Sequence, residues 1–127
     1  MARFLWICMA GALGTGTRYL VAQWASRALG TSFPYGTLFV NVAGCFLIAA
    51  IMQVALTTSL VSPTLRLVLT TGFMGGLTTY SSFNYETTRL MQEGAWRTAA
   101  VNYATTTAAC FAAGLLGFVL ARRLVSG

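Results

Sequence analysis

Long apolar stretches separated by short polar linkers make up most of the chain. Four of these stretches reach the roughly 20 residues that a helix needs to cross a bilayer. They lie near residues 4–28, 35–58, 64–91 and 96–122. The linkers Gly30–Pro34, Ser59–Pro63 and Gln92–Gly94 are only a few residues long. The pattern predicts a single all-α membrane domain over residues 1–127, embedded in a lipid bilayer, with four transmembrane helices.

The third stretch contains a segment rich in glycine and hydroxyl residues, which is unusual for a helix that faces lipid. Gly75 and Gly76 are followed by Leu-Thr-Thr-Tyr-Ser-Ser-Phe. Irregular backbone at membrane depth is tolerated only where protein buries it or where it lines a watery cavity. The two glycines can break the helix and free carbonyl groups, and the hydroxyls of Thr78 and Thr79 can bond such groups locally. We therefore expect a third helix that is broken near Gly75–Thr79, at a functional site.

Composition excludes several classes of function. Hydrophobic residues make up 57% of the chain and charged residues only 8%, whereas soluble domains carry about 25% charged residues. The net charge of +6 comes from scattered arginines, which do not indicate a nucleic-acid interface. Without His or Asp, the chain has no His-based triad, His-ligated metal site or aspartyl-phosphate, and we expect no enzymatic activity. Cys8, Cys45 and Cys110 lack metal or redox spacing, so we expect buried structural thiols.

The arginines do not choose one orientation for the bundle. After four crossings, the side with both termini carries four arginines and the other side carries three. A clear excess of basic residues on the cytoplasmic side normally sets orientation, so the near balance indicates a chain that inserts both ways. Such chains pair most simply as an antiparallel homodimer with a two-fold axis in the membrane plane. The two sets are Arg3, Arg66, Arg122 and Arg123, and Arg27, Arg89 and Arg97.

Arg18 lies well inside the first span, where a charged side chain costs about 2.5–3.5 kcal/mol on insertion scales. Two interpretations stay open. Arg18 is either a structural arginine bonded to carbonyls, or an anion-attracting group at the floor of a water-filled vestibule. No intramembrane acid is expected to neutralise it, because Glu86 and Glu93 lie toward the end of the third span. An unpaired cation in a membrane cavity favours anions over cations.

Other polar and aromatic residues inside the spans are candidates for an ion pathway. Asn41, one turn into the second span, offers two amide donors. Tyr80 and Phe83 share a helix face after the break, and their ring edges carry partial positive charge that attracts an anion. The structural alternatives are an interhelical hydrogen bond for Asn41 and core packing for the two rings.

Hydroxyl donors recur in the fourth span. Tyr103 lies about one helical turn before both Thr106 and Thr107, so the three can form a line of donors along one face. Membrane threonines also commonly bond to carbonyls of their own helix, and this alternative stays open for both.

The spans and motifs together resemble the Fluc (CrcB) fluoride-channel family over essentially the whole chain. The resemblance rests on an early Gly-rich segment ending in Arg-Tyr, on Gly-Thr-Leu followed by Val-Asn at 36–41, and on the segment at 75–83. It implies a passive fluoride exporter, and the compactness of the chain suits a bacterial inner membrane. It also implies a dual-topology antiparallel homodimer with two pores and a central structural Na⁺.

The resemblance also implies roles for individual residues. Asn41 is similar to the family's vestibule asparagine, and Tyr80 and Phe83 are similar to its paired pore phenylalanines. Gly75 and Thr78 match the residues whose backbone carbonyls bind Na⁺. Phenylalanine is usual where this chain has Tyr80, so the phenol is a departure.

Further matches extend the implied pathway. Ser81 and Ser82 match hydroxyl positions beside the aromatic pair, and Arg18 matches a buried basic residue. Tyr103 and Thr107 look like the start of the family's polar track. That track would next reach position 111, where this chain has an apolar phenylalanine.

Two other classes of function are alternatives to a channel. A small dual-topology multidrug exporter needs an intramembrane acid, and the first span has Arg18 instead. A non-transporting membrane scaffold explains the small residues but leaves Arg18, Asn41 and the broken third span without a purpose. Within fluoride transport, proton-coupled antiport is a narrower alternative to a passive channel.

Overall fold

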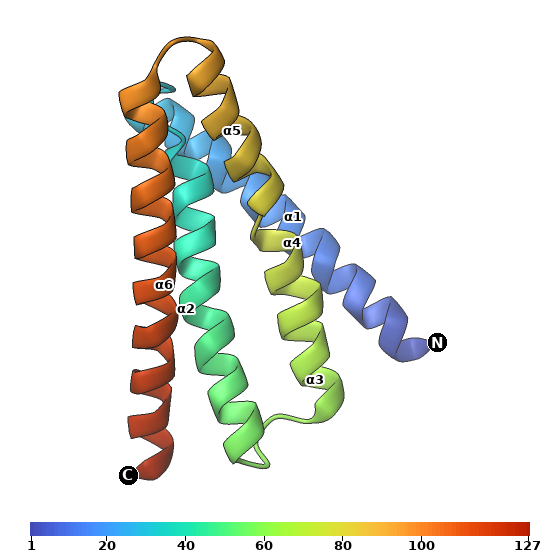
Figure 1. The fold of residues 1–127 in the computed structure, drawn as a ribbon. Helices are drawn as coiled ribbons and strands as arrows, with labels where there is room; N and C mark the ends of the chain where they lie inside the picture. Colours follow the sequence, from blue (N-terminus) through green and yellow to red (C-terminus); the bar gives the residue numbers. More distant parts are fainter.

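The structure is a computed structural model that describes residues 1–127, and it is helical with no strands. Its chain makes four passes along the bundle, so that both termini lie at the same end (Figure 1). The helices are α1 (Ala2–Leu29), α2 (Tyr35–Thr57), α3 (Pro63–Leu67), the π-helix η1 (Val68–Met74), α4 (Gly75–Leu77), α5 (Tyr80–Gln92) and α6 (Trp96–Ser126).

Three helices, α1, α2 and α6, are long and apolar enough to cross a membrane. They coincide with the first, second and fourth predicted spans. The third predicted span is divided among α3, η1, α4 and α5, so it contributes no single long helix. Ser62 and Pro63 define where this pass begins. The Ser62 hydroxyl accepts a hydrogen bond from the Leu65 amide at 3.2 Å, and Pro63 occupies the first helical position, where no amide donor is needed.

The break in the third pass lies at Thr78 and Thr79, inside the predicted segment but not at its glycines. Thr78 has φ −85° and ψ 156°, and Thr79 has φ −155° and ψ 108°, so both are extended. Gly75 and Gly76 belong to α4. The expectation that the glycines break the helix is therefore wrong.

Gly76, together with Gly72 one turn earlier, instead lets the third pass approach α1 closely. A Cβ on Gly76 would collide with the Gly11 carbonyl oxygen and would lie 2.9 Å from the Thr15 amide nitrogen. A Cβ on Gly72 would lie 2.8 Å from the Ile7 carbonyl oxygen. Small residues at these positions allow the backbones to pack directly, as is typical of membrane helices.

Large apolar side chains are exposed over much of the molecular surface. Only 19 of 127 residues are buried, and exposed side chains include many large hydrophobic residues on every long helix. A water-soluble monomer rarely exposes contiguous apolar patches larger than a few hundred Å². This surface therefore faces lipid or another protein chain.

Candidate functional site

Asn41 clamps the break in the third pass. It lies on α2 and is buried. The Thr79 amide donates a hydrogen bond to Asn41 Oδ1 at 2.7 Å, and Asn41 Nδ2 donates to the Thr79 carbonyl oxygen at 3.0 Å. The extended residue between α4 and α5 thus has both backbone polar groups paired with one side chain. This pairing explains how irregular backbone is tolerated inside the bundle.

The same contacts remove the helical partners of two carbonyl groups. In a continuous α-helix the Thr79 amide would donate to the Gly75 carbonyl, and the Ser82 amide would donate to the Thr78 carbonyl. Here the Thr79 amide donates to Asn41, and the Ser82 amide donates to the Thr79 hydroxyl at 3.1 Å. Gly75 and Thr78, the two predicted Na⁺ ligands, therefore keep carbonyl oxygens without these amide donors.

The N-terminus of α5 lies directly after the break and carries the predicted hydroxyls. Thr79 is its N-cap residue. The Thr79 hydroxyl lies 3.0 Å from Ser82 Oγ, to which it donates, and 3.2 Å from Ser81 Oγ. The amides of Tyr80 and Ser81 belong to the first turn of the helix, where backbone donors have no partner within the helix. The positive end of the helix dipole adds to their attraction for an anion.

The predicted aromatic pair extends to three rings. The rings of Tyr80 and Phe83 meet edge to face, with centroids 5.6 Å apart and planes at 64°. The Phe83 ring also stacks on Tyr103 of α6, at 5.9 Å and 28°. Phe83 is only 4% exposed, whereas Tyr80 is 77% exposed. Phe83 is thus the fixed centre of the group, and Tyr80 lies at the free flank.

A cavity of about 780 Å³ lies between α2, α4, the start of α5 and α6. It brings together seven of the predicted site residues, from three of the four passes. These are Asn41, Gly75, Thr78, Tyr80, Phe83, Thr106 and Thr107. Phe111, at the apolar end of the predicted polar track, lines it as well. The cavity is therefore lined by polar residues and the two residues with unpaired helical carbonyls near the break, and by apolar residues farther along.

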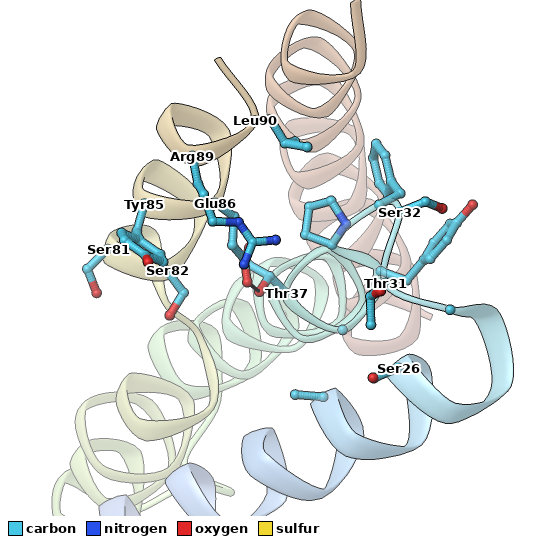
Figure 2. Close-up of a pocket in the computed structure, with 16 residues that line it drawn as sticks. Ser26, Thr31, Ser32, Thr37, Ser81, Ser82, Tyr85, Glu86, Arg89 and Leu90 are labelled. Atoms are coloured by element: carbon cyan, nitrogen blue, oxygen red, sulfur yellow. Dashed lines mark hydrogen bonds between the residues drawn. The ribbon is translucent and has the colours of Figure 1, made fainter. Parts of the chain in front are cut away.

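A second cavity, of about 440 Å³, opens at the loop between α1 and α2 and contains Ser81 and Ser82 (Figure 2). Figure 2 shows Glu86 and Arg89 of α5 directed toward Thr37 of α2. The Thr37 hydroxyl donates to Glu86 Oε1 at 2.8 Å. Glu86 Oε2 is buried and has no hydrogen-bond partner.

Glu86 is a residue that sequence reasoning missed. It was placed toward the end of the third span, yet its carboxylate reaches the interior of the bundle beside Thr37. An ionisable residue inside a transmembrane segment is by itself a signal of function, and that signal was available in the sequence.

Two predicted residues lie outside both cavities. Arg18 is half-buried on α1 and lines neither of them. It forms no ion pair, since the ion pair in the structure joins Arg89 and Glu93. Tyr103 also lines neither cavity, and its ring stacks on that of Phe83.

A buried polar network behind Phe83 was not predicted. Asn102, which is 1% exposed, donates to the Thr87 hydroxyl at 2.9 Å and accepts from the Thr106 hydroxyl at 3.2 Å. The Thr87 hydroxyl in turn donates to the Phe83 carbonyl oxygen at 2.7 Å. The network joins α5 to α6 and fixes the backbone that carries the Phe83 ring. It also assigns Thr106 a bond to Asn102 rather than to its own helix carbonyl.

Comparison with known proteins agrees with this arrangement. The family described as CrcB-like protein, Camphor Resistance (CrcB), matches residues 5–118. A Sorangium cellulosum protein named fluoride-specific ion channel FluC is 54% identical over 127 residues, which cover both chains completely. Proteins of that name from Anaeromyxobacter dehalogenans and Geobacter metallireducens are 52% and 51% identical, over 98% and 93% of this chain and 98% and 95% of theirs. The chain is a multi-pass membrane protein and belongs to the CrcB family.

Proposed function

We propose that the chain forms a fluoride-selective channel that exports fluoride passively and lowers its cytoplasmic concentration. The names of its relatives, fluoride-specific ion channels, support this function. The observation that carries the proposal is the group of hydrogen-bond donors and aromatic ring edges around a helix break within an apolar bundle. Such donors and ring edges can replace the water molecules that hydrate an anion. Conduction also requires that they bind the anion weakly enough for it to leave.

In this proposal fluoride passes the N-terminus of α5 between the two cavities. Ser81 and Ser82 line the smaller cavity, whereas Tyr80 and Phe83 line the larger one. All four belong to the first turn of α5 or directly follow it. Fluoride would lose its water stepwise to the serine hydroxyls, then to the aromatic edges and the remaining Asn41 amide hydrogen.

The line of donors continues on α6. Thr106 and Thr107 line the larger cavity, and the Tyr103 ring contacts Phe83. Thr107 would supply a hydroxyl to the passing ion. Thr106 instead donates to Asn102, so it would help to hold the network that positions Phe83. Arg18 would act at longer range, through its positive charge on α1.

The proposal includes a structural Na⁺ at an interface between two copies of the chain. Gly75 and Thr78 fit this ion, because their carbonyl oxygens lack the amide donors of a continuous helix and both residues line the larger cavity. Unwound carbonyls at the end of a half-helix are typical Na⁺ ligands in membrane proteins. When bound, Na⁺ would supply a positive charge that holds the converging carbonyl ends of the two copies together.

We propose that the second copy is antiparallel, so that the dimer has two pores in the bacterial inner membrane. The near balance of arginines between the two sides supports dual insertion. The exposed flank of the larger cavity, where Tyr80 and Phe111 are 77% and 71% exposed, leaves room for a partner.

Fluoride efflux from proteoliposomes, followed with a fluoride electrode, tests the function. We expect rapid efflux that needs no nucleotide, and we expect Phe83→Ile to reduce it at least tenfold because an aliphatic side chain has no polarised ring edge. Phe4→Ile, at an exposed position on α1, is the control and should leave efflux unchanged. Absence of efflux from protein that cross-linking shows to be dimeric would overturn the proposal.

Glu86 makes proton-coupled exchange the alternative to test, because carboxylates in membrane cavities are typical of proton relays. For a passive channel, the reversal potential in planar bilayers follows the fluoride gradient alone. A reversal potential that shifts when only the pH gradient is changed would instead support antiport.

A further inference from the structure

The fold brings two of the three cysteines together. Cys45 lies on α2 and Cys110 lies on α6, and both are free and half-buried. The two residues lie on neighbouring helices and line the same cavity. One turn beyond Cys110, a Cβ on Gly114 would lie 3.7 Å from the Cys45 carbonyl oxygen. The two backbones therefore pack closely at this level, with one cysteine on each helix.

Both thiols line the larger cavity, which also contains Phe83 and Thr107. The cavity volume of about 780 Å³ admits an ion or a small reagent. Cys8 lies on α1, is exposed and lines neither of the two cavities. The chain thus has two thiols in one cavity and a third thiol outside it that serves as an internal control.

We propose that Cys45 and Cys110 form a binding site for a soft divalent cation with two-coordinate geometry, such as Hg²⁺. Thiolate sulfur selects soft metals over the hard cations that prefer oxygen. No group of three or more His, Cys, Asp or Glu side chains is placed to hold a metal, so the four ligands of a structural zinc site are not available.

Charge balance favours a divalent ion over a monovalent one. The cation takes the place of two protons: both S–H bonds break, two sulfur–metal bonds form, and two protons leave to water. The product of two thiolates and one divalent cation is neutral. A monovalent soft cation would displace only one proton from a neutral site, so one of the two sulfurs would remain a thiol, which is a weaker ligand than a thiolate.

An occupied thiol pair would narrow the larger cavity beside Phe83 and Thr107, so we expect it to block fluoride transport. This effect rests on the proposed channel function, whereas metal binding itself does not. Binding and flux are therefore measured separately, on the same purified protein reconstituted in liposomes.

The binding test uses Hg²⁺ and the Cys8→Ser variant, in which only the pair remains. We expect one Hg²⁺ per chain, seen by intact mass as the metal minus two hydrogens, with two protons released and both thiols protected from alkylation. Adding Cys45→Ser or Cys110→Ser should weaken binding at least a hundredfold, because the two-point attachment is lost. Binding of two Hg²⁺ per chain, or equal affinity in the single-thiol variants, would overturn the site.

The flux test compares the same variants at one Hg²⁺ per chain. We expect Cys8→Ser to lose at least nine-tenths of its fluoride efflux and to recover it with a dithiol, whereas Cys8→Ser/Cys45→Ser should keep its efflux. Full efflux from mercury-loaded Cys8→Ser would overturn the block but leave the site standing. Absence of efflux before mercury is added would instead count against the channel function.

Discussion

At the residue scale, the side chain of Asn41 pairs with the backbone at the helix break and keeps one amide hydrogen free of that pairing. Its oxygen and one amide hydrogen pair with the backbone of Thr79. An asparagine amide has two hydrogens, so one remains for an ion in the cavity that Asn41 lines. Asn41 thus shapes the break, and in the proposed channel it would also supply a donor to the ion.

Replacing Asn41 should therefore affect stability as well as transport. Asn41→Ala leaves the buried amide and carbonyl of Thr79 without partners, and each unpaired group costs about 1–3 kcal/mol. We expect a lower thermal midpoint in detergent and at least tenfold slower fluoride efflux. Asn84→Ala, at an exposed position on α5, is the matched control. Equal midpoints for the two variants would show that the clamp does not stabilise the break.

Tyr80 differs from Phe83 in how firmly it is held. It is 77% exposed, and its contact within the chain is the edge-to-face pairing with the Phe83 ring. Tyr80→Phe keeps the ring and removes only the hydroxyl. We expect a change in unfolding free energy within about 0.5 kcal/mol, as for most surface substitutions, and fluoride efflux within about twofold of the unmodified chain. A tenfold change in efflux would show that the phenol itself contacts the ion.

At the element scale, the third pass shows that two adjacent glycines need not mark a break in a helix. Flexible backbone suggests a break at Gly75 and Gly76, yet both are helical. The break occurs where Asn41 can satisfy the backbone of Thr79 and where the Thr79 hydroxyl can cap the next helix. Gly76 is instead required by the distance between α4 and α1.

This account predicts opposite effects for two glycine substitutions. Gly76→Ala places a methyl group against the Gly11 carbonyl and the Thr15 amide, and such overpacking typically costs about 1–3 kcal/mol. Gly16→Ala on α1 meets nothing within 4 Å and should stabilise its helix by about 0.5–1 kcal/mol. Thermal unfolding in detergent compares them. A Gly76→Ala midpoint at or above that of Gly16→Ala would contradict close packing at this glycine.

The helices were easier to predict than the contacts between them. Apolar length alone located α1, α2 and α6, and the cost of polar groups in a membrane singled out Asn41 and the hydroxyls after it. The approach of Glu86 to Thr37 depends on how α5 lies against α2. The bond from Asn102 to Thr87 depends on how α5 lies against α6. Spacing along one helix carries no information about either pairing.

At the scale of the whole molecule, the exposed apolar surface and the distribution of arginines both favour pairing with a second, antiparallel chain. The chain buries few of its residues and exposes large apolar side chains, while its arginines are nearly balanced between the two ends of the bundle. The larger cavity has exposed aromatic side chains on its flank, at Tyr80 and Phe111. In the proposed assembly a second chain would cover this flank, and dual insertion would supply it in the antiparallel orientation.

Variants locked in opposite orientations provide the decisive test of this assembly. Arg27→Gln/Arg97→Gln leaves a clear excess of arginine on the side of the termini, and Arg66→Gln/Arg122→Gln/Arg123→Gln leaves the excess on the other side. By the rule that basic loops stay cytoplasmic, each variant should insert in one orientation. We expect neither variant alone to protect fluoride-sensitive cells, and both together to restore protection. Full protection by either variant alone, with its C-terminal tag found on one side only, would show that an antiparallel partner is not needed.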